Sequence, residues 1–240
     1  ALEKLDADER RRIARLLREY GLALPAIAGH TSLLAEDPEE HARNRERLFR
    51  TVDLAVDWAQ EDGPPAIDTT AGGKPDEWAQ RKDLLVERVA ELAEYAARSG
   101  VILAMEPHVG SIIDTPAKML ELIHLVNMPN VQVNFDISHF NVMGISIEES
   151  VSALAPYTVH THVKDERGLV PDFEFLIPGE GEFDYVAYLQ AMRRHGYQGF
   201  ISAEVSIMVQ RRPNYDPLEA ATLTYETLSR AFAQAGVSRE

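Results

Sequence analysis

VQVNFD at residues 131–136 and TVHTHVK at residues 158–164 are two segments in which the character of the side chain alternates with every residue. In the first segment, Val133 and Phe135 share one face of an extended strand, and Asn134 and Asp136 share the other. Helices cover both faces of a doubly wound sheet, which would need two apolar faces, whereas a closed parallel barrel is covered only outside and becomes polar at its mouth. We therefore predict an α/β fold, a TIM (β/α)8-type barrel.

The same alternation of strand and helix extends along the chain, because short apolar runs are followed by longer amphipathic stretches. Helix starts are marked by capping residues, namely Asp37, Thr115, Ser146 and Asp216, three of them followed by proline. The predicted strands are residues 22–29, 65–70, 101–106, 131–136, 158–163 and 199–205.

The chain opens on a charged helix over residues 1–20, and six strands follow it. A first β/α unit and a second strand of an eight-stranded barrel therefore have no counterpart in this sequence. We expect either that an N-terminal segment precedes this chain or that a partner closes the barrel. Residues 1–240 are predicted to form a single β/α barrel domain.

Composition narrows the range of functions. Apolar residues make up 45% and charged residues 26%, which is typical of a globular protein, and the absence of cysteine excludes disulfides and thiolate metal ligands. A net charge of −15 would repel a phosphate backbone, so we expect no nucleic-acid partner. No run approaches the roughly 18 apolar residues of a membrane span, and the start does not resemble a signal peptide. We expect a cytoplasmic protein without a membrane partner.

Four predicted strands end in a potential metal ligand: Glu106, Asp136, His162 and Glu204. Because the carboxyl ends of parallel strands converge at one mouth of a barrel, we expect these side chains to meet there. Each alone is more often a helix cap or an ion-pair partner. Together they favour a cation, since buried carboxylates without one would be costly. Three carboxylates and one imidazole suit Mn²⁺, Mg²⁺ or Co²⁺, with Zn²⁺ as a further possibility.

Several motifs carry a family resemblance: AMEPH at 104–108, DISH at 136–139, HVKD at 162–165, PGEGEFD at 178–184 and SAE at 202–204. Together they resemble the xylose isomerase-like TIM-barrel superfamily of sugar phosphate isomerases and epimerases, which has the AP endonuclease 2-type fold. The similarity covers most of the chain, from about residue 22 to the end.

The resemblance implies roles for individual residues. Glu106, Asp136, His162 and Glu204 would bind one divalent metal ion, most readily Mn²⁺, and the two glutamates would also move the substrate proton. His139 would contact substrate oxygens. Arg167 is a candidate for substrate binding, although its spacing from the metal histidine departs from the family pattern. The family also leads us to expect a homo-oligomer.

Other polar residues have two readings each. His30 and His108 either line a sugar pocket or are loop residues bonded to backbone, and Lys164 binds either a substrate oxygen or a neighbouring carboxylate. His160 is expected to support a ligand rather than to be one. Residues 166–183 exceed a usual βα connection and suggest a lid or a subunit contact.

This residue set suits proton abstraction next to a carbonyl, through a metal-bound enediolate. Two glutamates on opposite sides give epimerisation, and one glutamate acting on neighbouring carbons gives aldose–ketose isomerisation. We therefore predict a metal-dependent isomerase or epimerase of a small sugar or keto-polyol.

Three alternatives remain. A lyase of the same superfamily, such as an inosose dehydratase or an enzyme that eliminates the aglycone of a 3-keto glycoside, would begin with the same step. An endonuclease IV-like DNA-repair enzyme is disfavoured by the net charge and by the lack of a final Asp-x-His motif. A non-catalytic sugar-binding subunit would not require two glutamates.

Overall fold

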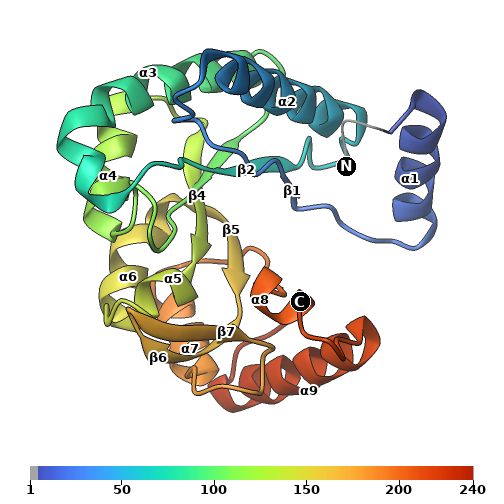
Figure 1. The fold of residues 1–240 in the computed structure, drawn as a ribbon. Helices are drawn as coiled ribbons and strands as arrows, with labels where there is room; N and C mark the ends of the chain where they lie inside the picture. Colours follow the sequence, from blue (N-terminus) through green and yellow to red (C-terminus); the bar gives the residue numbers. More distant parts are fainter. Residues whose placement is uncertain (1–4, 240) are drawn as a thin grey trace.

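Six parallel strands form a curved sheet in the computed structural model, which describes residues 5–239 (Figure 1). Their order across the sheet is β1-β2-β3-β4-β5-β8. Within the described residues, β1 and β8 each pair on one side only, so the sheet is an incomplete barrel. The strands are β1 (Ala26–Ala28), β2 (Ala66–Thr70), β3 (Leu103–Glu106), β4 (Val131–Asp136), β5 (Thr158–Val163) and β8 (Ser202–Ala203).

The strand predictions are most accurate at the centre of the sheet, where β4 and β5 have the predicted bounds. The predictions over 22–29 and 199–205 are too long, because β1 and β8 keep only 3 and 2 residues. Beyond these short strands, backbone groups form hydrogen bonds with side chains rather than with a neighbouring strand. Gln60 Oε1 accepts a hydrogen bond from the Leu24 N–H at 2.8 Å, and Thr161 Oγ1 donates to the Phe200 carbonyl at 2.8 Å.

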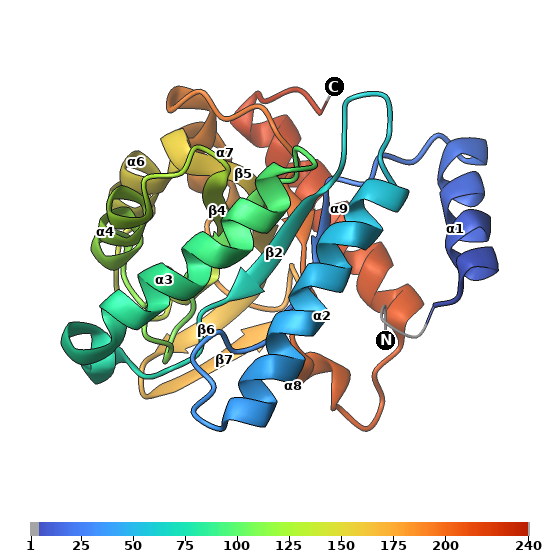
Figure 2. The ribbon, with the colours of Figure 1, turned by 90° about the horizontal axis from the view of Figure 1, so that it is seen from above.

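Helices lie outside the sheet (Figure 2). The predicted caps are present, since Asp37, Thr115, Ser146 and Asp216 each accept a backbone N–H of the first helical turn. Among the helices that the structure describes, none is long and apolar enough to cross a bilayer. They are α1 (Ala7–Glu19), α2 (Pro38–Asp57), α3 (Trp78–Ala97), α4 (Pro116–Val126), α5 (Ile137–Asn141), α6 (Ile147–Leu154), α7 (Tyr185–Arg194), α8 (Ile207–Gln210) and α9 (Pro217–Ala235), with 3-10 turns η2 (Pro75–Glu77) and η3 (Ala155–Tyr157).

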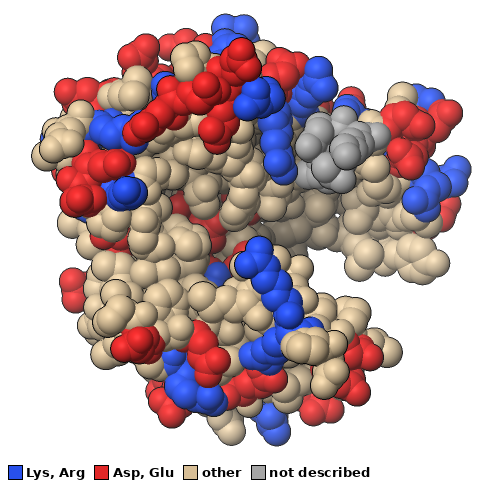
Figure 3. All heavy atoms as spheres, viewed as in Figure 1, with Lys and Arg blue, Asp and Glu red and all other residues tan. Residues whose placement is uncertain are grey.

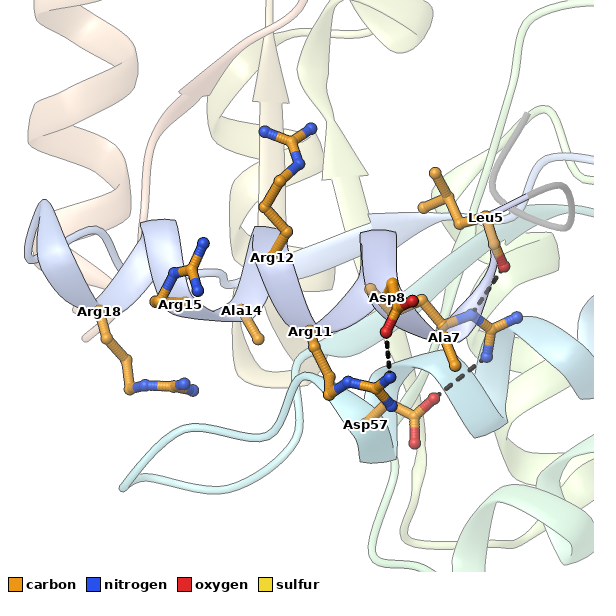
Figure 4. A pocket seen from close by; sticks show the side chains of 10 residues that line it. Leu5, Ala7, Asp8, Arg11, Arg12, Ala14, Arg15, Arg18 and Asp57 are labelled. Atoms are coloured by element: carbon orange, nitrogen blue, oxygen red, sulfur yellow. Dashed lines mark hydrogen bonds and ion pairs between the residues drawn. The ribbon is translucent and has the colours of Figure 1, made fainter.

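The charged helix predicted over residues 1–20 is α1, with residues 1–4 outside the described part of the chain. It lies at the open side of the sheet (Figure 1) and contacts the end of α2. Arg10 Nη1 lies 3.1 Å from Asp57 Oδ2, and the Trp58 indole donates to the Arg10 carbonyl at 3.1 Å. A cavity of about 820 Å³ beside α1 is lined by five arginines, two of which already pair with aspartates (Figure 4).

The long segment over residues 166–183 forms most of a hairpin that was not predicted from the sequence, in which β6 (Asp165–Leu169) pairs antiparallel with β7 (Asp172–Leu176). Its base is fixed by the buried Asp165 carboxylate, which accepts backbone N–H groups of Glu166, Gly179 and Phe183 at 3.1, 2.8 and 3.0 Å. A Cβ at Gly181 would overlap this carboxylate, so glycine is required there. A lid or contact role for the segment stays a prediction.

The apolar faces of the strands pack against these helices. Phe135 of β4 is 0% exposed, and its ring centroid lies 6.0 Å from that of Phe140 and 6.2 Å from that of Tyr188. This face of β4 thus joins α5 and α7 in one core, while the opposite face of the strand is free to carry polar groups.

Phe135→Ala should lower the free energy of unfolding by about 3–5 kcal/mol, because the ring leaves a cavity in a rigid core. Urea denaturation would measure the change. Phe200→Ala is the matched control, since this ring is 51% exposed and its loss should change stability by roughly 0.5 kcal/mol or less. Equal losses in the two variants would contradict the packing described here.

Candidate active site

Four side chains converge at the carboxyl ends of neighbouring strands. Glu106 and Asp136 are the last residues of β3 and β4, His162 lies opposite Asp136 on β5, and Glu204 follows β8. One potential ligand atom from each lies within 4.8 Å of the others. Acidic side chains are visible in the hollow between the two halves of the molecule (Figure 3). The structure thus brings together the four residues that strand alternation singled out.

Two carboxylates of this cluster are buried. Glu106 is 1% and Asp136 0% exposed, and burial is the main reason that the pKa of Glu106 is raised. Burial acts to lower the pKa of His162, but the hydrogen bond and charge of Glu106, together with Asp136, outweigh it and raise the pKa to about 9. The carboxylates therefore draw positive charge onto the imidazole, whose Nδ1 lies 3.4 Å from Glu106 Oε1.

Lys164 places an ammonium group between two of the carboxylates. Its Nζ lies 2.5 Å from Asp136 Oδ2 and donates a second hydrogen bond to Glu204 Oε2. Burial acts to lower the pKa of Lys164, but Asp136, Glu204 and Glu106 outweigh it and raise the pKa. Burial acts to raise the pKa of Asp136, but the charge and hydrogen bond of Lys164, together with the neighbouring imidazoles of His139 and His162, outweigh it and lower the pKa. Of the two readings of Lys164, the carboxylate contact is the one that the structure contains.

His139 forms one wall of the site next to Lys164. Its Nε2 lies 3.5 Å from both Asp136 Oδ2 and Lys164 Nζ, and its ring centroid is 3.8 Å from that of His108. Phe175 of the hairpin packs edge-on against His139 at 5.2 Å. Burial holds the pKa of His139 well below its usual value, so the imidazole is neutral and can both donate to and accept from a hydroxyl group.

Asp68 of β2 is a site residue that the sequence analysis missed. It is 1% exposed, and its Oδ1 lies 2.5 Å from His30 Nε2, which in turn lies 3.4 Å from Glu106 Oε2. The signal was present in the sequence, because Asp68 shares one face of a predicted strand with Ala66 and Thr70, opposite Ile67 and Thr69.

Two other predicted residues lie outside the cluster. Arg167, a candidate substrate ligand, is 54% exposed; it pairs with Glu174 Oε1 at 2.9 Å and donates to the Glu180 carbonyl at 2.9 Å. Arg167 is therefore held in solvent by its pairing across the hairpin with Glu174. His160 is buried, packs edge-on against His162 at 5.3 Å, and has a pKa lowered by burial to about 4.

The donor set fits a divalent cation. Glu106 Oε2 and Asp68 Oδ1 are buried oxygens without a hydrogen-bond partner among the described residues. Ionised carboxylates in such surroundings need a compensating charge. Carboxylate oxygens combined with an imidazole nitrogen are ligands that Mn²⁺, Mg²⁺, Co²⁺ and Zn²⁺ all accept.

Glu166 of β6 is a further buried carboxyl group close to this cluster. It is 3% exposed, and its Oε1 accepts a hydrogen bond from Asn141 Nδ2 at 2.6 Å. Burial, helped by the charges of Asp136 and Asp165, raises the pKa of Glu166 to about 8. This carboxyl group therefore keeps its proton at neutral pH.

Comparison with known proteins gives a consistent result. The profile of a family described as xylose isomerase-like TIM barrel matches residues 1–226. Inosose isomerase of Bacillus subtilis is 30% identical over 141 residues, which cover 56% of this chain and 49% of that protein. Inosose dehydratase of Histophilus somni is 28% identical over 167 residues, 62% of this chain and 53% of that protein. The chain thus spans about half the length of these curated relatives.

Among solved structures, the IOLI protein with a binding zinc atom has a TM-score of 0.78 and 20% sequence identity, covering 100% of this chain and 85% of that chain. At this level of identity, the similarity shows the fold alone.

Glu166→Gln should alter the pH dependence of stability. A raised folded-state pKa contributes stability that is complete below the unfolded value of 4.5 and is lost as pH rises through about 8. The glutamine variant lacks this loss, so it should gain stability relative to the parent across that window, by at most about 1.4 kcal/mol per pH unit. Urea denaturation at several pH values would measure the gain.

Glu174→Gln on the same hairpin is the control, because its carboxylate is exposed and paired with Arg167. A pH profile for Glu166→Gln that runs parallel to those of the parent and the control would show that Glu166 is ionised in the folded protein.

Proposed function

The chain belongs to the xylose isomerase-like TIM barrel family, and from this premise we propose that it is a divalent-metal-dependent isomerase or epimerase of a small sugar or keto-polyol. The observation that carries the proposal is the convergence of Glu106, Asp136, His162 and Glu204 at the ends of four adjacent strands. The similarity to an inosose isomerase supports the substrate class. Mn²⁺ is the proposed ion, since it accepts mixed carboxylate and imidazole ligands, as Mg²⁺, Co²⁺ and Zn²⁺ also do.

Glu106, Asp136, His162 and Glu204 would hold the cation. When bound, a dication stabilises the negative charge that develops on adjacent substrate oxygens as a carbon proton leaves. The chain's own part is to position the substrate and to move that proton.

The two glutamates are placed to transfer it. β4 and β5 lie between β3 and β8, so Glu106 and Glu204 approach from the outer strands of the four. One carboxylate can remove the proton and the other can return it from the opposite side, which inverts the carbon; a single carboxylate serving adjacent carbons gives isomerisation. Lys164 Nζ donates a hydrogen bond to Glu204 Oε2 and so helps to orient this carboxylate.

The substrate hydroxyls need partners of their own. We assign this role to the neutral imidazole of His139, to His108 whose ring lies against it, to His30 on the other side of Glu106, and to Lys164. Arg167 would have to leave Glu174 to join them.

A lyase is the second candidate, because the similarity to an inosose dehydratase favours it. Proton removal is common to both reactions. If the next carbon carries a leaving group, the electron pair that stays on the carbon after the proton has left expels that group as water or an alcohol. An isomerase, by contrast, conserves the mass of its substrate. Mass analysis of the products of a panel of keto-sugars and keto-inositols therefore separates the two.

Incubation with such a panel in D₂O and Mn²⁺ should place deuterium on a substrate carbon, detected by NMR. In Glu204→Gln and in Glu106→Gln the rate should fall roughly 100-fold or more, because each loses a proton-transfer group. Glu148→Gln, with an exposed carboxylate on α6, should exchange at the parent rate. Undiminished exchange in both site variants would remove the proposed acid and base.

Lys164→Met should bind Mn²⁺ at least about tenfold more tightly than the parent. The ammonium group of the parent repels a dication, and it forms ion pairs with the oxygens of Asp136 and Glu204 that the cation would use. Calorimetric titration would measure the dissociation constants. Lys118→Met is the control, as Lys118 pairs with Asp114 instead. An unchanged affinity in Lys164→Met would mean that the lysine and the ion do not share these oxygens.

A further inference from the structure

We propose that Glu166 and Asn141 are positioning residues, whose buried hydrogen bond holds the β6–β7 hairpin against one wall of the active site. Asn141 is the last residue of α5, which follows β4 directly, and its Nδ2 donates to Glu166 Oε1 at 2.6 Å. Glu166 is the second residue of β6. The bond therefore joins the hairpin to the helix that carries His139. The inference rests on the proposed function, because this wall belongs to the proposed site.

The register of the hairpin places Glu166 on the face that is turned to this wall. Glu166 pairs with Phe175, and residues directly opposite each other on antiparallel strands project to the same face. The ring of Phe175 packs edge-on against His139 at 5.2 Å. The next pair, Arg167 and Glu174, projects to the opposite face and is exposed.

The hairpin is joined to α5 at two points, one near its base and one at its turn. The first is the Glu166 bond, and the second is a hydrogen bond from the Val170 N–H to the Val142 carbonyl at 2.8 Å. Only the first depends on side chains. Because α5 begins directly after Asp136 and contains His139, its attachment to the hairpin fixes where Phe175 meets the site.

The surroundings of Glu166 suit a neutral carboxyl group. The residue is 3% exposed, and its Oε2 has no hydrogen-bond partner among the described residues. Burial, with Asp136 at the end of β4 and Asp165 on β6, raises the pKa of Glu166 to about 8, and Lys164 opposes this. On α7, burial is the main reason that the pKa of Tyr185 is raised, so its phenol is neutral as well. Ionisation would leave a charge that one hydrogen bond cannot compensate, and the hairpin would have to move to admit water.

Spin labels can follow the hairpin directly, because the chain contains no cysteine. Asp172→Cys lies next to the turn of the hairpin and Glu149→Cys lies on α6, and both positions are exposed. Pulsed EPR of the doubly labelled full chain would give the distance between them at about pH 6.5 and about pH 9.5, on either side of the pKa of Glu166. We expect a narrow distribution at the lower pH and a broader, longer one at the higher pH.

Three variants of the labelled chain separate the causes. Glu166→Gln keeps the acceptor oxygen and cannot ionise, so its distribution should stay narrow at both pH values. Asn141→Ala lacks the donor and should be broad at both. Glu174→Gln, whose exposed carboxylate belongs to the next pair, is the matched control and should behave as the parent does.

Circular dichroism at both pH values would show which variants fold, and the parent and Glu166→Gln decide the question alone if Asn141→Ala does not. A parent distribution that is equally narrow at both pH values would overturn the proposal. A broadening at high pH that persists in Glu166→Gln would overturn it too, because another group would then move the hairpin.

Deuterium exchange on the panel of keto-sugars and keto-inositols gives a second readout. Near neutral pH, Asn141→Ala should raise KM roughly tenfold and change kcat less, because Phe175 is no longer held against His139. Glu166→Gln should stay close to the parent, and a large fall in its kcat would overturn the positioning role by showing that Glu166 transfers a proton itself. No exchange in the parent would remove the proposed function, while the EPR distances would still decide whether this bond holds the hairpin.

Discussion

The cost of burying negative charge governs this site. A parallel sheet that curves toward a barrel brings the last residues of its strands to one surface, and here that surface holds Glu106 and Asp136, both almost fully buried. Carboxylates in this position must acquire protons, ion pairs or a metal. The raised pKa of Glu106, the proton held by His162 and the ammonium of Lys164 are three responses to the same demand.

The hairpin compensates a buried carboxylate by hydrogen bonds from the backbone, and these bonds also position one wall of the site. Asp165 follows Lys164 directly and is also buried, yet its charge is satisfied by three backbone N–H groups instead of a cation. Those bonds fix the base of β6 and β7. The ring of Phe175 therefore lies beside His139, with its centroid 4.8 Å from Lys164 Nζ. One motif, HVKD, thus contributes a candidate ligand, a counter-charge and an anchor.

Strand alternation accounts for most of what could be predicted from the sequence. It identified the central strands and the four converging residues, because an inner polar face next to an outer apolar face is a local property of each strand. It did not locate the hairpin, whose pairing depends on the contacts of Asp165 with Gly179 and Phe183, distant in sequence. Nor could motif spacing place Arg167, because the pairing of β6 with β7 decides which way that side chain points.

The incomplete barrel affects the residues of the site differently. Glu106, Asp136, His162 and Glu204 belong to four consecutively paired strands, so their geometry follows from hydrogen bonds within the described sheet. His30 lies beyond β1, which pairs with β2 alone, and its side chain is 36% exposed while that of Asp68 is 2% exposed. Any strand that paired with β1 would therefore restrict His30 most and Asp136 least. The four converging residues are positioned by the sheet itself, whereas the position of His30 also depends on what covers the open edge at β1.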